Sequence, residues 1–419
     1  DQMATVDKNY DIDKRLYGYF KMIGKLLENT TPREMEAAFS SLSPSRREVF
    51  SMVKQHGKTF EYLTAANADW TDGLINARKR NQKVVLTTYC YPVGVLYAYD
   101  CIPANAEVLT AFGAILFPGG VSDFLDYAVE AGMTETSCSG QRAALGAYFH
   151  GLGSKPDFCI ANSAGICDSN ANAYHYYCSH QDIPMYMLDA PPELTGERAT
   201  KYHRQDFRNM LKFLEEQTGN KTDWDKLRDV AMEMKKQDDI VNEIQQLVKA
   251  VPCPAPPLIQ AFIYVSKFSL NGTRAGTKVL QEMLDVTRAN YEKGVAGTLT
   301  GKEKARCLSS YIDHYTLNLR FFTIFNELEI STLGSFLNYY FNHGAPYAEG
   351  REDQCYTLDF STEEAIVDSL ADQLARMPML KQIRGPYDAP EMWLEDTLAA
   401  CRIYKADCTL YMGTLGCRN

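Results

Sequence analysis

The chain of 419 residues is 45% hydrophobic and 23% charged, which is typical of a soluble globular protein. Its formal net charge of −10 and the lack of basic runs argue against a surface for nucleic-acid phosphates. No apolar stretch approaches the roughly 18 residues of a membrane span, and the charged start of the chain lacks the apolar core of a secretion signal. We therefore expect a cytoplasmic protein whose twelve cysteines are reduced.

The first 80 residues carry a helical pattern, and an alternation of strands and helices begins at Lys83. Apolar runs rich in β-branched residues predict strands, and amphipathic runs closed by glycine predict helices. The predicted order is strand 83–92, helices 123–132 and 138–153, strand 157–162, helix 168–180 and strand 184–189. Strands that alternate with helices in this way indicate a parallel sheet with both faces covered.

Residues 192–300 form a charged and mostly helical segment. Its longest helix, 222–250, begins with a capping signal at Thr222. The spaced glycines of 271–279 mark a helix start, because the GxxxxGK[ST] pattern of a phosphate loop is absent. After this segment the alternation returns, with strand 304–312, helices 317–329, 361–377 and 389–406, and strand 407–417.

These patterns predict an α/β fold with two parallel-sheet units. We divide the chain into an N-terminal helical region 1–80, a first α/β domain 81–191, a helical segment 192–300 and a second α/β domain 301–419. The helical segment is then an insertion between the two α/β domains.

Three cysteines follow strands or precede helices, at the corners where α/β proteins build their sites. They are Cys138, Cys167 and Cys417, each with Gly or Ser nearby. Helix N-termini favour thiolates, which are metal ligands and nucleophiles. Their separations of 29 and 250 residues match no short iron–sulfur signature. A metal held by three ligands from separate corners keeps one coordination position open. The alternative interpretation is that the three residues are ordinary loop cysteines.

The remaining cysteines have simpler interpretations. Cys178 and His175 lie on one predicted helix, where a zinc site is conceivable but ordinary helix residues are favoured. Cys159, Cys307 and Cys408 are predicted to be buried in strands. Cys401 falls on a helix.

Four stretches in order resemble the 2-hydroxyacyl-CoA dehydratase and benzoyl-CoA reductase family, which includes 2-hydroxyglutaryl-CoA dehydratase. They are YPVGVLYAYDCIPANAEVLTAFGA, GMTETSCSGQRAALG, the segment 155–191 and KADCTLYMGTLGCRN. The chain departs from the family pattern where Gly94 replaces an acid, Ala106 replaces a proline and Gly140-Gln141 replaces Tyr-Ala. The family continues well beyond the last cysteine, so the resemblance predicts a C-terminal truncation.

The resemblance implies two Rossmann-like domains and a [4Fe-4S] cluster, or a larger iron–sulfur cluster, held by Cys138, Cys167 and Cys417. It implies an acyl-CoA substrate, a homologous second subunit or a homodimer, and an ATP-hydrolysing iron–sulfur activator protein. Glu107 would act on the substrate hydroxyl or a proton, or be a solvated surface carboxylate. Substrate contacts would come from Thr88, Tyr89 and Arg142, unless these are only a strand end and a surface arginine.

The reaction that the resemblance implies is loss of water from a 2-hydroxyacyl-CoA. One electron added to the thioester carbonyl gives a ketyl radical, which expels the α-hydroxyl and makes the β-proton acidic. Two alternatives remain open within the family: an oxidoreductase such as a benzoyl-CoA reductase, and a non-catalytic subunit that relays electrons. Outside the family, the chain would be an α/β binding protein without a cluster.

Overall fold

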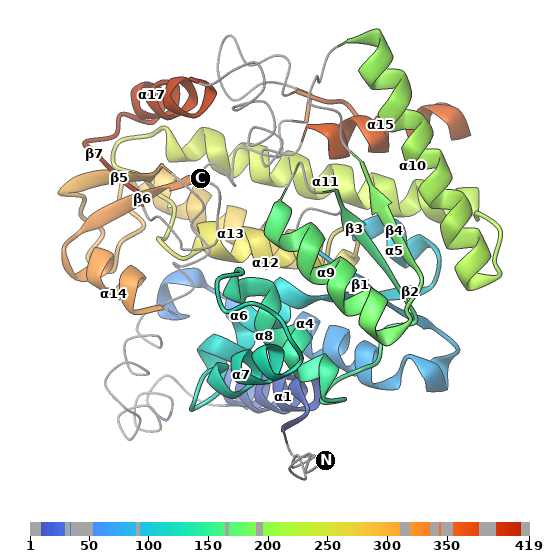
Figure 1. Ribbon diagram of the computed structural model, residues 1–419. Helices are drawn as coiled ribbons and strands as arrows, with labels where there is room; N and C mark the ends of the chain where they lie inside the picture. Colours follow the sequence, from blue (N-terminus) through green and yellow to red (C-terminus); the bar gives the residue numbers. More distant parts are fainter. Residues whose placement is uncertain are drawn as a thin grey trace.

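The computed structural model describes residues 10–29, 34, 53–88, 93–163, 167–189, 196–310, 319–335, 343–344, 355–376 and 391–411. Within these residues the protein is a mixed α/β structure with two separate parallel sheets (Figure 1). The predicted α/β class with parallel sheets is confirmed. None of the described helices is long and apolar enough to cross a membrane.

The first sheet has four parallel strands in the order β2-β1-β3-β4. Their bounds are β1 Lys83–Thr87, β2 Cys101–Asn105, β3 Phe158–Asn162 and β4 Met185–Leu188. Val84 and Leu86 join one hydrophobic cluster and Val85 joins the other, because alternate side chains of a strand point to opposite faces. Both faces are therefore buried, as parallel sheets require.

Strand β2 was not predicted, because its sequence CIPAN contains a proline and follows a turn. A proline lacks the N–H that a central strand needs. The structure resolves this conflict by placing β2 at the edge of the sheet, where only β1 pairs with it.

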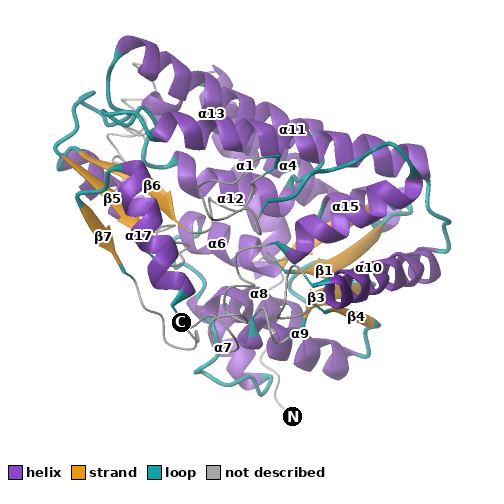
Figure 2. Ribbon diagram, turned by 90° about the horizontal axis from the view of Figure 1, so that it is seen from above, coloured by secondary structure: helices purple, strands orange, loops and turns teal. Residues whose placement is uncertain are grey.

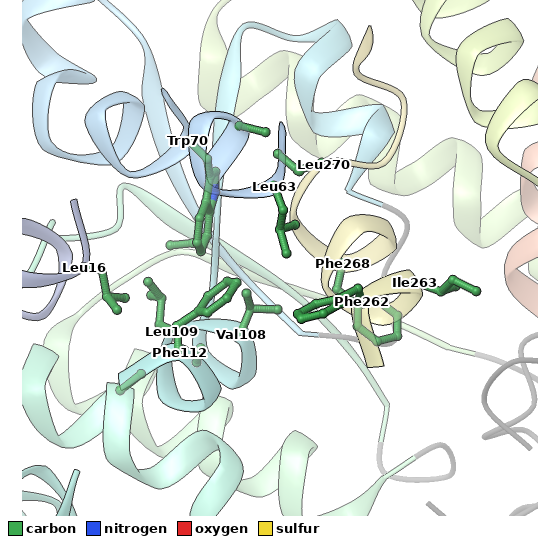
Figure 3. Close-up of a cluster of buried hydrophobic side chains, with 14 of the residues drawn as sticks. Leu16, Leu63, Trp70, Val108, Leu109, Phe112, Phe262, Ile263, Phe268 and Leu270 are labelled. Atoms are coloured by element: carbon green, nitrogen blue, oxygen red, sulfur yellow. The ribbon is translucent and has the colours of Figure 1, made fainter. Parts of the chain in front are cut away.

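Helices cover both faces of this sheet and connect its strands. They are α1 Ile12–Asn29, η2 Lys54–His56, α4 Thr59–Asn76, η3 Arg78–Arg80, α5 Gly94–Ala98, α6 Ala106–Leu116, α7 Ser122–Glu130, α8 Ser139–Phe149 and α9 Asp168–Gln181. Side chains of α1, α4 and α12 meet those of α6 in one core, as Leu16, Trp70, Leu109 and Phe268 illustrate (Figure 3). This core fixes the direction in which α6 leaves the sheet edge.

The predicted helical segment consists of α10 Glu197–Thr218, α11 Trp224–Val248, α12 Ile259–Ser269 and α13 Arg274–Lys293. The predicted helix start near 271–279 is confirmed, with Thr273 as the cap of α13. The cap of α11 is Asp223, whose carboxylate accepts from the Lys226 backbone N–H. The prediction of Thr222 was wrong by one residue.

The second sheet has three parallel strands in the order β6-β5-β7. Its strands are β5 Ala305–Ser309, β6 Ile330–Ser335 and β7 Cys408–Leu410, and the nearby helices are α14 Leu319–Glu327 and α17 Met392–Tyr404. The helix α15 Glu363–Ala375 packs against α10 on the side of the first sheet (Figure 1). Cys159 and Cys307 are buried as predicted, but Cys408 is exposed, because β7 is a short edge strand. Residues 412–417 of the predicted last strand lie outside the described residues.

The two sheets lie on opposite sides of the molecule, with α6 and α12 between them (Figure 2). A buried polar group ties α12 to its neighbours, because Lys267 of α12 forms an ion pair with Asp238 of α11. The hydroxyl of Tyr356 and the amide of Gln373 on α15 also donate to Asp238, at 2.7 and 2.8 Å. The predicted division of the chain into four regions stays a prediction.

Candidate active site

The carboxyl ends of β1, β2 and β3 meet at one edge of the first sheet. From β1 the chain continues to β2 on one side, and then returns to β3 on the other side of β1. In open α/β sheets, ligands bind outside the carboxyl ends of the strands at such a reversal. Glu107, Cys138 and Cys167 all lie in segments that follow these strand ends.

Cys138 and Cys167 occupy equivalent positions at the starts of two helices. Cys138 is the N-cap residue of α8, and Cys167 is the N-cap residue of α9. Both side chains are half-buried and neither is in a disulfide. The Cys167 sulfur accepts from the backbone N–H of Asn170 at 3.4 Å, the interaction that a helix N-terminus offers to a thiolate.

Ser169 joins these two helix starts. Its hydroxyl, in the first turn of α9, accepts a hydrogen bond from the backbone N–H of Cys138 at 3.0 Å. The N-terminal ends of α8 and α9 are therefore adjacent, although Cys138 and Cys167 are far apart in the sequence. This bond fixes the relative positions of the two cysteines.

Glu107 lies in the first turn of α6, immediately after β2. The Asn105 side chain caps α6 by accepting from the Val108 N–H at 3.2 Å, so the helix begins at the strand end. Glu107 Oε1 accepts from the Asn170 side-chain amide at 2.9 Å, and Oε2 lies 2.9 Å from the Tyr174 hydroxyl. Glu107 is therefore bound to α9 and is not the solvated surface carboxylate of the alternative interpretation.

The Tyr174 hydroxyl has two acceptors within reach but only one proton. Its oxygen is 2.8 Å from the Thr87 carbonyl and 2.9 Å from Glu107 Oε2. When Glu107 is protonated, it donates to Tyr174 while Tyr174 donates to Thr87, and every group is satisfied. Burial raises the pKa of Glu107 to about 7, although the bonds from Tyr174 and Asn170 oppose the shift.

In space, Gly140 lies between the side chains of Glu107 and Cys138. A Cβ added to Gly140 would lie 3.5 Å from the Cys138 sulfur and 3.9 Å from Glu107 Cγ. Both groups therefore adjoin the space beside this glycine. Arg142, two residues further along α8, is buried rather than on the surface and donates to the Thr134 carbonyl at 3.1 Å.

Several buried polar atoms of the described part of this edge have no hydrogen-bond partner. They are Thr87 Oγ1, Gln141 Oε1, both amide atoms of Asn162, Asn170 Oδ1 and Arg142 Nε. Asn162 also lines a small cavity with His203, whose Nε2 contacts Asp372 Oδ1 at 3.1 Å. Buried polar groups normally find partners, so this edge is suited to a polar ligand.

The structure brings Glu107, Cys138 and Cys167 to one edge, while Thr88 is buried at the end of β1. Tyr89 and Cys417 lie outside the described residues. Sequence reasoning missed Asn170 and Tyr174. Their spacing of three and seven residues from Cys167 puts all three on one face of α9, which is a signal that the sequence does contain.

The side chains at this edge supply part of the ligand set of an iron–sulfur cluster. Two half-buried thiols at adjoining helix N-termini fit a cluster, which is held by thiolates. Among the described residues, no three His, Cys, Asp or Glu side chains gather so that they could hold a metal. A third ligand would have to come from elsewhere in the chain, and Cys417 is the residue that the sequence predicts.

The family model described as 2-hydroxyglutaryl-CoA dehydratase, D-component, matches residues 88–419. The chain belongs to this family. The resemblance noted in the sequence is therefore confirmed, and the matched region begins at the end of β1, so it contains the whole candidate edge except Thr87.

The chain is also similar to the (R)-phenyllactyl-CoA dehydratase alpha subunit of Clostridium sporogenes. The two are 24% identical over 285 residues, which is 64% of this chain and 65% of that protein. The chain thus matches just under two thirds of the length of this relative.

Proposed function

We propose that the chain is an iron–sulfur subunit of a 2-hydroxyacyl-CoA dehydratase that removes water from an acyl-CoA by way of a ketyl radical. The observation that carries the proposal is the meeting of Glu107, Cys138 and Cys167 at one sheet edge, within a chain of the dehydratase D-component family. Cys138 and Cys167, with Cys417 as third ligand, would hold a [4Fe-4S] cluster. Such a cluster would supply the single electron that the thioester carbonyl takes up.

Glu107 is the proposed acid for the leaving hydroxyl. With its pKa near 7, a large share of its carboxyl groups carries a proton at neutral pH. After the proton has left, the carboxylate needs new donors. Tyr174 can then shift its hydrogen bond from the Thr87 carbonyl to Glu107, because its hydroxyl already lies within reach of both oxygens.

The names of the family and of the relative support a larger assembly. The family is a D-component and the relative is an alpha subunit, so both are parts of multi-subunit enzymes. We therefore propose that a second subunit and an activator that hydrolyses ATP complete the enzyme. Thr88, Tyr89 and Arg142 are the proposed substrate contacts.

The test is an anaerobic measurement of iron and acid-labile sulfide in the purified protein. We expect about four irons per chain, with loss of most of the iron in Cys167→Ser. Cys178→Ser is the matched control, because Cys178 lies on the same helix but is buried away from the helix start. Equal iron in both variants, or no iron after reconstitution, would contradict the proposal.

A second measurement separates dehydration from reduction. The iron-loaded protein, its partner subunit and the activator are incubated with a 2-hydroxyacyl-CoA, and ATP hydrolysis is compared with product formation. A dehydratase returns its electron and so forms many products per ATP. A reductase consumes ATP in proportion to product, and that result would replace the dehydratase proposal with the reductase alternative.

A further inference from the structure

Three cysteines lie on elements of the second sheet and its neighbouring helix, away from the edge of the first sheet that holds Cys138 and Cys167 (Figure 2). Cys307 lies on β5, Cys408 on β7 and Cys401 on α17. None of them is in a disulfide. Cys307 is only 4% exposed, Cys401 is half-buried and Cys408 is exposed.

Cys307 and Cys408 lie directly opposite each other on paired parallel strands. Neighbouring strands are about 4.8 Å apart, and directly opposed side chains leave the same face of the sheet. The strand pairing therefore places the two thiols beside each other. Disulfides join residues whose Cα atoms are roughly 4.4–6.8 Å apart, so the strand pairing sets a suitable separation.

We propose that Cys307 and Cys408 form an oxidisable dithiol that closes a cross-strand disulfide on reaction with a low-molecular-weight disulfide. The exposed sulfur of Cys408 attacks one sulfur of the oxidant, whose S–S bond breaks and releases one thiol. The sulfur of Cys307 then loses its proton and attacks Cys408, and a second thiol leaves. Two protein thiols lose two electrons, and the oxidant gains both.

The environment of each thiol fits this order of events. Burial, followed by the neighbouring Cys408, raises the pKa of the Cys307 thiol to about 12, so Cys307 is not the first nucleophile. Cys408 is accessible to an oxidant, because β7 is an edge strand of only three residues. The disulfide would fasten this short strand to β5 by a covalent bond.

The first sheet contains a natural control pair. Cys159 of β3 and Cys178 of α9 are neighbours in one buried cluster, and burial, followed by the neighbouring Cys178, raises the pKa of the Cys159 thiol. They are 0% and 2% exposed, so an oxidant cannot reach either thiol in the folded protein. Comparison of the two pairs separates the effect of access from the effect of proximity.

The test maps disulfides in the reduced, full-length protein after incubation with oxidised glutathione. Remaining thiols are alkylated, and the digested peptides are identified by mass spectrometry. We expect a peptide pair joined through Cys307 and Cys408, with loss of two hydrogens, and no pair joined through Cys159 and Cys178. In Cys307→Ser the reaction should stop at a glutathione adduct on Cys408, and in Cys408→Ser it should leave Cys307 unmodified.

Three outcomes would overturn the proposal. The first is a glutathione adduct on Cys408 in the wild type without closure to Cys307. The second is a bond from Cys408 to Cys401 or to a second molecule. The third is equal oxidation of the Cys159–Cys178 pair, which would mean that reaction follows unfolding rather than exposure. The wild-type map alone decides these points, so the proposal does not depend on the stability of a variant.

Discussion

The proton shared between Glu107 and Tyr174 is the residue-scale feature on which the proposed chemistry depends. Replacement of Glu107 by Gln removes the acidic proton but keeps the shape of the side chain and its hydrogen bonds to α9. We expect Glu107→Gln to bind iron normally and to lower the dehydration rate by about 100- to 10,000-fold. The wild-type rate should fall as the pH rises above about 7, because the proton donor is lost above the pKa of Glu107.

Rates are measured under anaerobic conditions with the complete enzyme, together with the iron content of each variant. The matched control is Glu135→Gln, an exposed carboxyl of the loop before α8, which should leave the rate unchanged. A Glu107→Gln enzyme with near wild-type rate would remove Glu107 from the mechanism and leave it with a structural role.

The positions of cysteines at helix starts were sufficient to predict Cys138 and Cys167 as candidates, whereas Glu107 was predicted from the family resemblance. The contacts between them could not be predicted, because they depend on how α6, α8 and α9 meet. The hydrogen bond from the Cys138 N–H to the Ser169 hydroxyl joins the starts of α8 and α9, between which the chain forms all of α8 and strand β3. The environment of Arg142 was also missed, since a charged helix residue is usually exposed.

At the scale of elements, most helices were predicted because their amphipathic patterns and caps are local signals. Strands β2 and β6 were missed for local reasons too. The proline of β2 argues against a strand, and β6 follows directly on the predicted helix 317–329, in a stretch with serine and glycine for which no strand was predicted. Only the pairing of each with a neighbouring strand identifies them.

Helices α7 and α8 pack closely at Gly146, and this contact supports the helix that begins at Cys138. A Cβ on Gly146 would lie 1.9 Å from the Phe124 carbonyl oxygen and 2.8 Å from the Ala128 nitrogen. These are backbone atoms, so a whole helix would have to move. We expect Gly146→Ala to lower the free energy of unfolding by about 3 kcal/mol, measured by urea denaturation.

Gly18 provides the matched control for this substitution. It is also inside a helix, α1, but nothing lies within 4 Å of an added Cβ. Gly18→Ala should therefore stabilise the protein by about 1 kcal/mol through helix propensity. Equal effects of the two substitutions would mean that α7 and α8 are not in close contact.

For the whole molecule, the buried group around Asp238 connects α11, α12 and α15. The side chains of Lys267 and Asp238 are 2% and 0% exposed. Burial lowers the pKa of Lys267, while the neighbouring carboxylate opposes the shift. Lys267→Met would leave the Asp238 carboxylate buried without its counter-charge, and we expect it to cost about 3–5 kcal/mol of unfolding free energy.

Two further variants check this expectation by urea denaturation. Lys235→Met breaks the exposed ion pair with Asp239 on the same helix and should cost less than about 1 kcal/mol. The double variant Lys267→Met with Asp238→Leu should recover part of the loss, because no charge is then buried alone. Equal costs for Lys267→Met and Lys235→Met would show that the buried pair adds nothing to stability.

The four strands of the first sheet come from one continuous part of the chain, and this sets when the sheet is synthesised. All four strands lie between Lys83 and Leu188, so on the ribosome they are complete before β5 begins at Ala305. Domains generally fold as units in the order of synthesis. The sheet edge with Cys138 and Cys167 is therefore available early, whereas Cys417 comes after β5 and β7 in the chain. Assembly of the proposed three-cysteine site must then wait until the strands of the second sheet have been synthesised.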